Sequence, residues 1–288
     1  MDLKYLREMG NDLYHRLHLP TYPVAIKYIK SEAEIPESTI RPSAGGQQWS
    51  LCQAITYARR WGWHSAMTEK DNFCVPSSAS HRWVDVSYEE LLESQVRQGW
   101  RKDQAAEERH FAHVAETRFA GQEGKERYEK MRQYIGCVYS PLTETIIEPD
   151  SVIIYGDGSH LTHMIQALSY DYTEPIASSF NGFGESCYKG CLWPFISGQA
   201  QVVIPGMGDR AFSGTAEQEI ALGIPGTALQ TLTKYLFKSG VDKNMGLPVK
   251  PLLAMGLTAS ITPGFKYLRD IVDNKGKKNN TKKKEPKQ

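Results

Sequence analysis

The sequence predicts a single α/β domain, with an α+β arrangement also open, in which helices flank a mixed β-sheet. The most apolar run, residues 151–155 (SVIIY), is typical of a central strand covered on both faces. Strand-like and helix-like patterns alternate along the chain, as in layered α/β proteins. With 288 residues, 40% of them hydrophobic and 23% charged, the chain has an ordinary globular composition and can bury a large core. We place this domain at residues 1–270.

Elements in the first half follow from leucine spacing, prolines and one capping signal. Leucines at helical spacing predict a first helix that Pro20 ends, and the run PVAIKYIK predicts a strand. Ser50 with Gln53 three residues later has the form of a capping box, which predicts a helix as far as about Gly62. The expected order is a helix at 2–18, a strand at 23–30, a loop at 31–48, a helix at 50–62 and a short strand at 64–67.

The second half predicts further helices and strands. Ser87 and Glu90 form a second capping box, and a strongly charged stretch at about 100–135 indicates a solvent-facing helical insertion. Strands are expected at 137–139, 151–155 and 201–204, with a helix after the turn GDGSH and a last helix around 229–236 that Gly240 ends.

Residues 271–288 are expected to form a disordered tail rich in lysine. The stretch 275–288 holds seven lysines and one glutamate and no apolar residue, so it cannot offset the entropy cost of ordering. It lacks the aromatic and arginine residues of a specific nucleic-acid reader. We therefore expect no specific nucleic-acid partner.

Two features bear on the compartment. No apolar run approaches the roughly 20 residues that span a bilayer, and the N-terminal residues lack the apolar core of a secretory signal. Five cysteines, an odd number, favour reduced thiols over a disulfide framework. We therefore expect a cytoplasmic protein without a membrane span.

Chemistry is expected first at the segment 49–74, which holds Cys52 and Cys74. Cys52 falls in the first turn of the predicted helix, where the partial positive charge of the helix end favours the thiolate. Arg59 and Arg60 lie farther along the same helix. A cysteine in this position is either a reactive thiol or a metal ligand.

A second cysteine pair lies in the segment 183–193. Cys187 and Cys191 are four residues apart and would share one face of a helix. With Cys52 and Cys74 they could supply four thiolates to zinc or to an iron–sulfur cluster. No C-x-x-C motif is present, and unpaired cysteine is often a small buried hydrophobe, so the spacing alone also allows packing roles.

Several segments in a specific order resemble one family. They are YPVAIKYIKSEAEIP, LCQAITYAR, DNFC, EPDSVIIYGD, MIQALSY, ESCYKGC and EIALGIPGTALQTL, which together are similar to the uncharacterised bacterial and archaeal ArCR family. The resemblance covers about residues 20–240. It implies one α/β domain and a cytoplasmic setting, and it maps the recurring cysteines of the family onto Cys52, Cys74 and Cys187.

The chain also departs from that family pattern. Where many relatives carry glycine and cysteine after the strand QVVI, this sequence reads PGMGDR, with Met207 and Asp209. The resemblance therefore implies that a fourth ligand comes from Cys191 or from outside the thiol set. Since the family has no settled activity, it implies no reaction, and whether the chain is an enzyme stays open.

The leading hypothesis is an iron–sulfur cluster with a redox or ligand-activating role in anaerobic metabolism. Its expected ligands are Cys52, Cys74, Cys187 and Cys191, and its expected partner is a small-molecule ligand, contacted by Arg59, Arg60 and Trp61, or a redox protein. A homo-oligomer is also open. One alternative is a non-catalytic binding protein with an aromatic pocket of Trp49, Tyr57, Trp61 and Trp63. Another is an enzyme with Cys52 or Cys74 as nucleophile.

Overall fold

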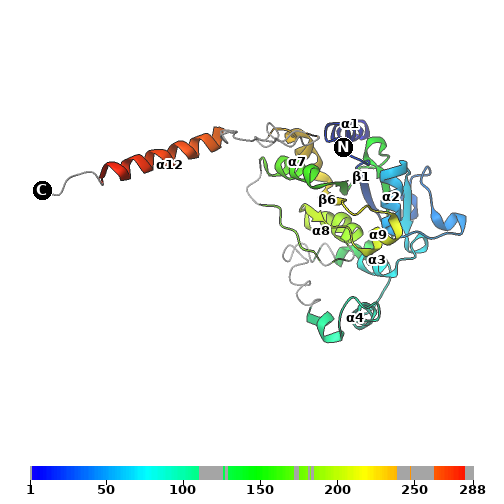
Figure 1. The fold of residues 1–288 in the computed structure, drawn as a ribbon. Coiled ribbons are helices and arrows are strands. Elements are labelled where there is room, and N and C mark those ends of the chain that lie inside the picture. Colours follow the sequence, from blue (N-terminus) through cyan, green and yellow to red (C-terminus); the bar gives the residue numbers. More distant parts are fainter. Residues whose placement is uncertain are drawn as a thin grey trace.

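The chain forms a six-stranded sheet in the order β2-β3-β1-β4-β6-β5 (Figure 1). The computed structural model describes residues 2–109, 126, 129–171, 175–180, 182, 185–238, 247 and 263–282. The strands are β1 (Val24–Ile29), β2 (Ser65–Thr68), β3 (Gly136–Pro141), β4 (Ser151–Gly156), β5 (Gln201–Val203) and β6 (Ile220–Pro225). Together with helices on both faces, this sheet confirms the predicted α/β class.

The pairing of the strands differs from the mixed sheet that we expected. Every pairing between named strands in the described residues is antiparallel, and two isolated bridges, Ile40 with Ser65 and Trp49 with Asn72, are parallel. The N-terminal strand β1 lies between β3 and β4 and runs opposite to both. An apolar run shows that a strand is buried but not its direction, which the tertiary position of β1 decides.

Helices cover both faces of the sheet. One face packs against α1 (Leu3–Arg16), α7 (Gly158–Ser169) and α10 (Leu229–Tyr235). The other packs against α2 (Leu51–Trp61), a π-helix η6 (Glu185–Leu192) and α8 (Trp193–Ser197), with α9 (Met207–Ser213) beside α2. Along β4, Val152 and Ile154 enter the first core and Ile153 and Tyr155 the second. This confirms the prediction that 151–155 is a central strand covered on both faces.

Short elements complete the described chain. The remaining α-helices are α3 (Val75–Ser80), α4 (Tyr88–Arg97) and α12 (Pro263–Lys282). The 3-10 turns are η1 (Glu32–Glu34), η2 (Pro42–Gly45), η3 (Glu69–Asp71), η4 (Lys130–Gln133), η5 (Leu142–Glu144) and η7 (Gly226–Ala228).

Both predicted capping boxes are confirmed. The Ser50 hydroxyl accepts from the Gln53 N–H (3.1 Å) while the Gln53 side chain accepts from the Ser50 N–H (2.8 Å). Ser87 and Glu90 make the same reciprocal pair at the start of α4. Helix α2 ends at Gly62, whose φ of 73° is the left-handed conformation that glycine adopts without strain. These local signals are sufficient to place the two helix starts.

Two expected regions fall partly outside the described residues. The charged insertion at about 100–135 is described only at 100–109, 126 and 129–135, and Gly240 is not described. Helix α12 covers much of the expected disordered tail and extends away from the body in Figure 1, whereas 283–288 lie outside the described residues. No helix in the described part of the chain is both long enough and apolar enough to cross a bilayer.

We expect Gly223→Ala to destabilise the fold, because β6 and η6 approach each other closely at this residue. A Cβ on Gly223 would lie 2.2 Å from the carbonyl oxygen of Gly190. Overpacking of this kind costs about 1–3 kcal/mol of unfolding free energy. Urea denaturation measures the change. Gly158→Ala is the matched control, since a Cβ on Gly158 has no neighbour within 4 Å; equal stability of the two variants would contradict the close approach.

Candidate functional site

Four elements bring thiols and one carboxylate together beside the second core. Cys52 lies in the first turn of α2, Cys74 is the N-cap of α3, Cys187 lies on η6 and Asp209 lies on α9. Helix α2 packs against α9 and η6, and α3 also packs against η6. We call these four residues the thiol–carboxylate cluster.

Cys52 is at the centre of this cluster. Its thiol lies beside the Cys187 thiol and the Asp209 carboxylate, close enough to interact with both. The interaction with the Cys187 thiol, burial and the charge of Asp209 together raise the pKa of the Cys52 thiol well above its usual range. We expected the helix end to favour the thiolate. In the structure the surroundings favour the neutral thiol, because two acidic neighbours and burial outweigh the partial charge of the helix end.

Cys74 is held at the edge of the cluster by its backbone. Its N–H donates to the Asn72 side chain (3.1 Å), and its carbonyl accepts from the Ser77 hydroxyl (2.8 Å). Burial and the nearby Cys187 thiol raise the pKa of the Cys74 thiol, and hydrogen bonds from Ser77 oppose that rise. Cys52 and Cys74 are partly exposed, whereas Cys187 is buried. The solvent-facing side of the cluster is therefore that of Cys52 and Cys74.

Cys191 lies deeper than the other predicted ligands. Its exposed fraction is 0%, and its thiol interacts electrostatically with Cys187 and with Cys137 of β3. Burial raises the pKa of the Cys191 thiol well above its usual range, and that of Cys137 to about 12. The structure thus brings Cys52, Cys74 and Cys187 together and places Cys191 on the core side of Cys187.

Asp209 stands out in the sequence only as a departure from the family pattern. Its side chain is buried, with a residue exposure of 3%. Oδ2 accepts a hydrogen bond from the Gly206 N–H (2.9 Å), while Oδ1 has no partner at hydrogen-bonding geometry in the described residues. Burial raises the pKa of the Asp209 carboxyl, although Ser186, the Gly206 amide and the Cys52 thiol lie close enough to oppose the rise. Only the fold reveals its contact with Cys52.

The cluster does not form a ready site for a single metal ion. Among the residues that the structure describes, no group of three or more His, Cys, Asp or Glu side chains is arranged to hold one. Ligands of an iron–sulfur cluster bind different irons and are spaced more widely than the ligands of one ion. The arrangement of the side chains therefore disfavours a site for a single metal ion but does not bear on an iron–sulfur cluster in the same way.

The residues predicted to contact a ligand lie elsewhere on α2. Arg59 is fully buried, and its guanidinium donates to both carboxylate oxygens of Glu219 (2.5 and 3.1 Å) while lying 4.1 Å from the centroid of the Tyr155 ring. Arg60 also donates to Glu219 (3.1 Å). Both positive charges are thus paired with Glu219, that of Arg59 in the interior and that of Arg60 at the surface. Trp61 is 57% exposed.

The four aromatic residues expected to form a binding pocket contact one another. The Tyr57 ring lies 4.5 Å from Trp49, 5.5 Å from Trp61 and 5.1 Å from Trp63, measured between centroids. Their flat faces are partly used by these mutual contacts. Trp49 precedes α2, Tyr57 and Trp61 lie on it, and Trp63 follows its end.

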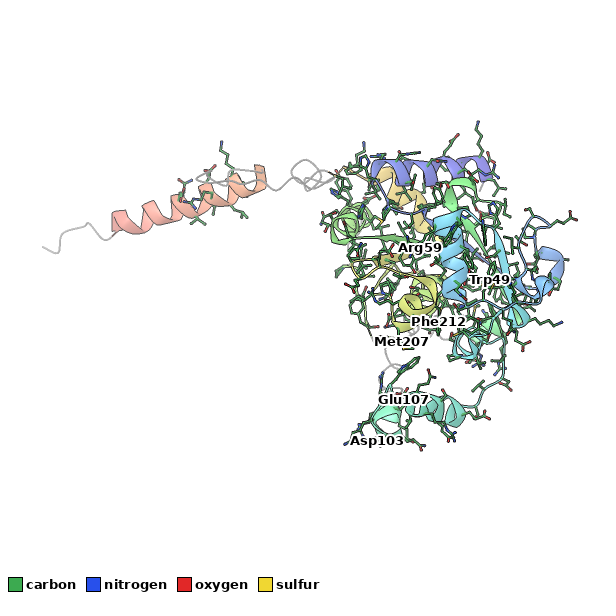
Figure 2. All side chains as sticks on the ribbon, turned by 45° about the vertical axis from the view of Figure 1, so that its right-hand side comes forward. Trp49, Arg59, Asp103, Glu107, Met207 and Phe212 are labelled. Carbon is green, nitrogen blue, oxygen red and sulfur yellow. The ribbon has the colours of Figure 1, made fainter. Side chains whose placement is uncertain are left out.

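Apolar side chains border the thiol–carboxylate cluster. Phe73 and Val75 flank Cys74, and Met207 and Phe212 belong to the same helix as Asp209. All four are exposed, from 40% for Phe73 to 57% for Val75, and the Phe73 and Phe212 rings are 5.7 Å apart. In Figure 2, Met207 and Phe212 lie on the side of the body towards the segment with Asp103 and Glu107. We call these four residues the apolar border.

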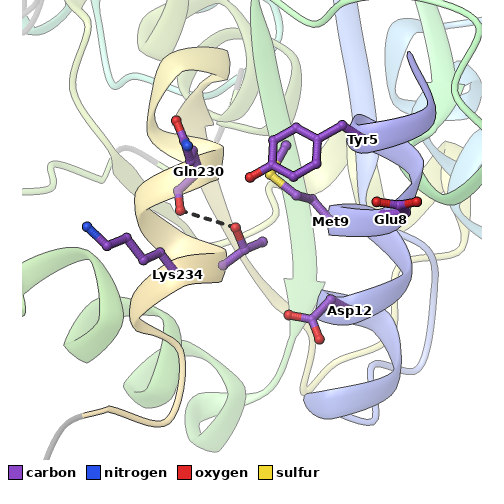
Figure 3. A pocket seen from close by; sticks show the side chains of 7 residues that line it. Tyr5, Glu8, Met9, Asp12, Gln230 and Lys234 are labelled. Carbon is purple, nitrogen blue, oxygen red and sulfur yellow. Dashed lines mark hydrogen bonds between the residues drawn. The ribbon is translucent and has the colours of Figure 1, made fainter. Parts of the chain in front are cut away.

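An open pocket of about 410 Å³ lies between α1 and α10, helices that cover the opposite face of the sheet from α2 and η6 (Figure 3). Its lining residues are Tyr5, Glu8, Met9, Asp12, Gln230, Thr233 and Lys234. It contains no residue of the predicted site.

Comparisons with known proteins identify a family and a distant relative of this chain. The chain belongs to the uncharacterised ArCR family, whose model matches residues 12–234. It is 21% identical over 238 residues to an uncharacterised protein of Methanocaldococcus jannaschii, a match that covers 82% of this chain and 95% of that protein. No solved structure matches significantly. Family membership confirms the resemblance seen in the sequence and assigns no activity.

Proposed function

We propose that this protein carries an iron–sulfur cluster bound by Cys52, Cys74 and Cys187, with a redox or ligand-activating role in anaerobic metabolism. The observation that carries the proposal is the thiol–carboxylate cluster itself. Besides burial, the largest causes of the pKa shifts of Cys52, Cys74 and Asp209 are thiols, hydroxyls, amides and a carboxylate, and no cationic side chain of the described residues is among them. These acidic groups cannot all ionise without a positive charge, which bound iron would supply while displacing the thiol protons.

The apolar border supports a role that involves a partner. Exposed apolar groups beside a site commonly mark a contact surface for a ligand or a protein. Phe73 and Val75 flank the proposed ligand Cys74 directly, so a redox partner docked there would lie beside the iron–sulfur cluster. A small-molecule ligand that reaches the partly exposed Cys52 and Cys74 side would pass the same residues.

Iron loading should depend on Cys52 and not on Cys137. We expect the protein, purified without oxygen, to contain iron and sulfide and to absorb visible light, and Cys52→Ser to lose most of both, since an alcohol replaces a thiolate ligand. Cys137→Ala removes a cysteine that lies in the core, outside the proposed ligand set, and should leave loading unchanged. Iron and sulfide analysis with visible absorption makes the measurement. A folded, colourless and iron-free protein would overturn the proposal.

A thiol–disulfide function is the second candidate, favoured by the closeness of the Cys52 and Cys187 thiols. A disulfide between them would release two protons and two electrons, the electrons passing to a disulfide of a partner protein. Mass spectrometry after alkylation would then show that Cys52 and Cys187 are not alkylated in the oxidised protein.

A nucleophilic thiol and an aromatic binding pocket have less support. A nucleophilic role for Cys52 or Cys74 needs a thiolate, and the pKa of both thiols is raised. A binding protein based on Trp49, Tyr57, Trp61 and Trp63 would bind its ligand equally well after Cys52→Ser. That variant therefore separates a binding protein from the leading proposal.

A further inference from the structure

The orphaned oxygen of Asp209 is the most unusual polar atom beside the cysteines. Oδ1 is buried without a hydrogen-bonding partner in the described residues, although burial of an unpaired carboxylate oxygen is costly. Natural sites that keep such an atom commonly use it for a ligand or an ion. The Cys52 thiol is beside it.

The backbone of α9 fixes where this oxygen lies. The Gly206 N–H holds Oδ2, which fixes the orientation of the carboxylate. Gly208 lies against the sulfur of Cys52, since a Cβ on Gly208 would be 4.0 Å from Sγ. The start of α9 therefore approaches the first turn of α2 closely, and this approach places Asp209 beside Cys52.

We propose that Oδ1 of Asp209 is the fourth ligand of the centre, so that three thiolates and one carboxylate hold a cubane cluster of four irons. This inference rests on the proposed function and replaces Cys191 in the ligand set. Cys191 is fully buried, with Cys137 of the core as well as Cys187 and Asp209 among its electrostatic neighbours, whereas Asp209 lies beside the partly exposed Cys52.

A carboxylate ligand makes one iron different from the other three. Oxygen is a harder donor than thiolate and suits iron–sulfur chemistry less well, so the iron bound by Asp209 is the most weakly held. When an oxidant such as ferricyanide takes one electron from the cubane cluster, this iron leaves as ferrous ion. The three-iron cluster that remains keeps its three cysteine ligands.

The test compares three proteins that carry the cluster. Wild-type protein, Asp209→Asn and Asp209→Cys are purified without oxygen, checked for folding by circular dichroism and titrated with ferricyanide. EPR spectra and iron analysis follow the cluster. We expect wild type to convert to the three-iron form on oxidation, Asp209→Asn to contain that form at the outset, and Asp209→Cys to lose its iron roughly tenfold more slowly, or slower still.

Each outcome decides a separate question. If Asp209→Asn and Asp209→Cys keep four irons and convert at the wild-type rate, Asp209 is not a ligand and the inference fails while the proposed function stands. Should wild type contain no iron, the proposed function fails instead. Where Asp209→Asn does not fold, the rate of Asp209→Cys alone decides. Loss of the fourth iron in Cys191→Ala, with Asp209 intact, would return the fourth position to Cys191.

Discussion

Glu219→Gln is expected to lower the free energy of unfolding by about 3–5 kcal/mol, the range for breaking one partner of a buried ion pair. Arg59 is fully buried, and Glu219 is its bidentate counter-ion. Burial alone would raise the pKa of the Glu219 carboxyl, but hydrogen bonds from Arg59 and the Ala216 N–H lower it, so the carboxylate is charged at neutral pH. The glutamine variant keeps the shape and leaves the guanidinium without a counter-ion.

Urea denaturation at neutral pH measures this loss, and the chain offers a matched control. Glu93 pairs with Arg97 on the surface of α4, where both side chains are more than half exposed. Glu93→Gln should therefore change stability by less than about 1 kcal/mol. If the Glu219 and Glu93 variants lose equal stability, water reaches Arg59 and the pair is not a buried one.

The same ion pair shows what the sequence could not predict about the site. The sequence of α2 alone indicates that Arg59 and Arg60 could bind an anionic ligand. Their partner, Glu219, is about 160 residues away and precedes a strand, β6, that the apolar pattern did not identify. A long-range pair of this kind leaves no local signal, so the sequence could not show that Glu219 pairs with both arginines.

Local signals predicted the elements that depend on a few neighbouring residues. Each capping box, at Ser50 and at Ser87, depends on two residues three positions apart, and the central strand β4 depends on one short apolar run. All three predictions are confirmed. Strand direction is different, because β1 inserts between β3 and β4 only in the assembled sheet. The π-helix η6 is also tertiary in origin, since it is buried along its whole length against the sheet.

The candidate site was partly visible in the sequence. The resemblance to the ArCR family brought Cys52, Cys74 and Cys187 together, and the fold places them side by side. The i, i+4 spacing of Cys187 and Cys191 could not show that the second thiol lies in the core. Asp209 has no distinguishing pattern of its own, and its importance comes from a contact between α9 and α2.

Acid should destabilise the protein between about pH 6.5 and 4 through His81. Its residue exposure is 0%, its Nδ1 is 2.8 Å from the Ser77 carbonyl oxygen, and its Nε2 is buried without a partner in the described residues. The Ser77 contact identifies Nδ1 as the protonated nitrogen of a neutral ring. Burial lowers the pKa of His81 to about 4, from the 6.5 of an exposed histidine.

In that pH range the unfolded chain binds a proton at His81 and the folded chain does not. The free energy of unfolding therefore decreases as the pH falls. Above pH 6.5 both forms are neutral and His81 contributes no dependence. A difference of this size corresponds to about 3 kcal/mol lost by pH 4. His64, whose pKa is also lowered by burial, acts in the same direction.

Urea denaturation at several pH values compares wild type with His81→Gln, whose side chain stays neutral. We expect the variant to be less stable at pH 7, because it packs less well, and to lose less stability between pH 6.5 and 4. His64→Gln shows how much of the slope belongs to the second histidine. If the pH dependence of the unfolding free energy is the same in His81→Gln as in wild type, His81 takes up its proton in the folded state. The prediction of a buried neutral ring would then be wrong.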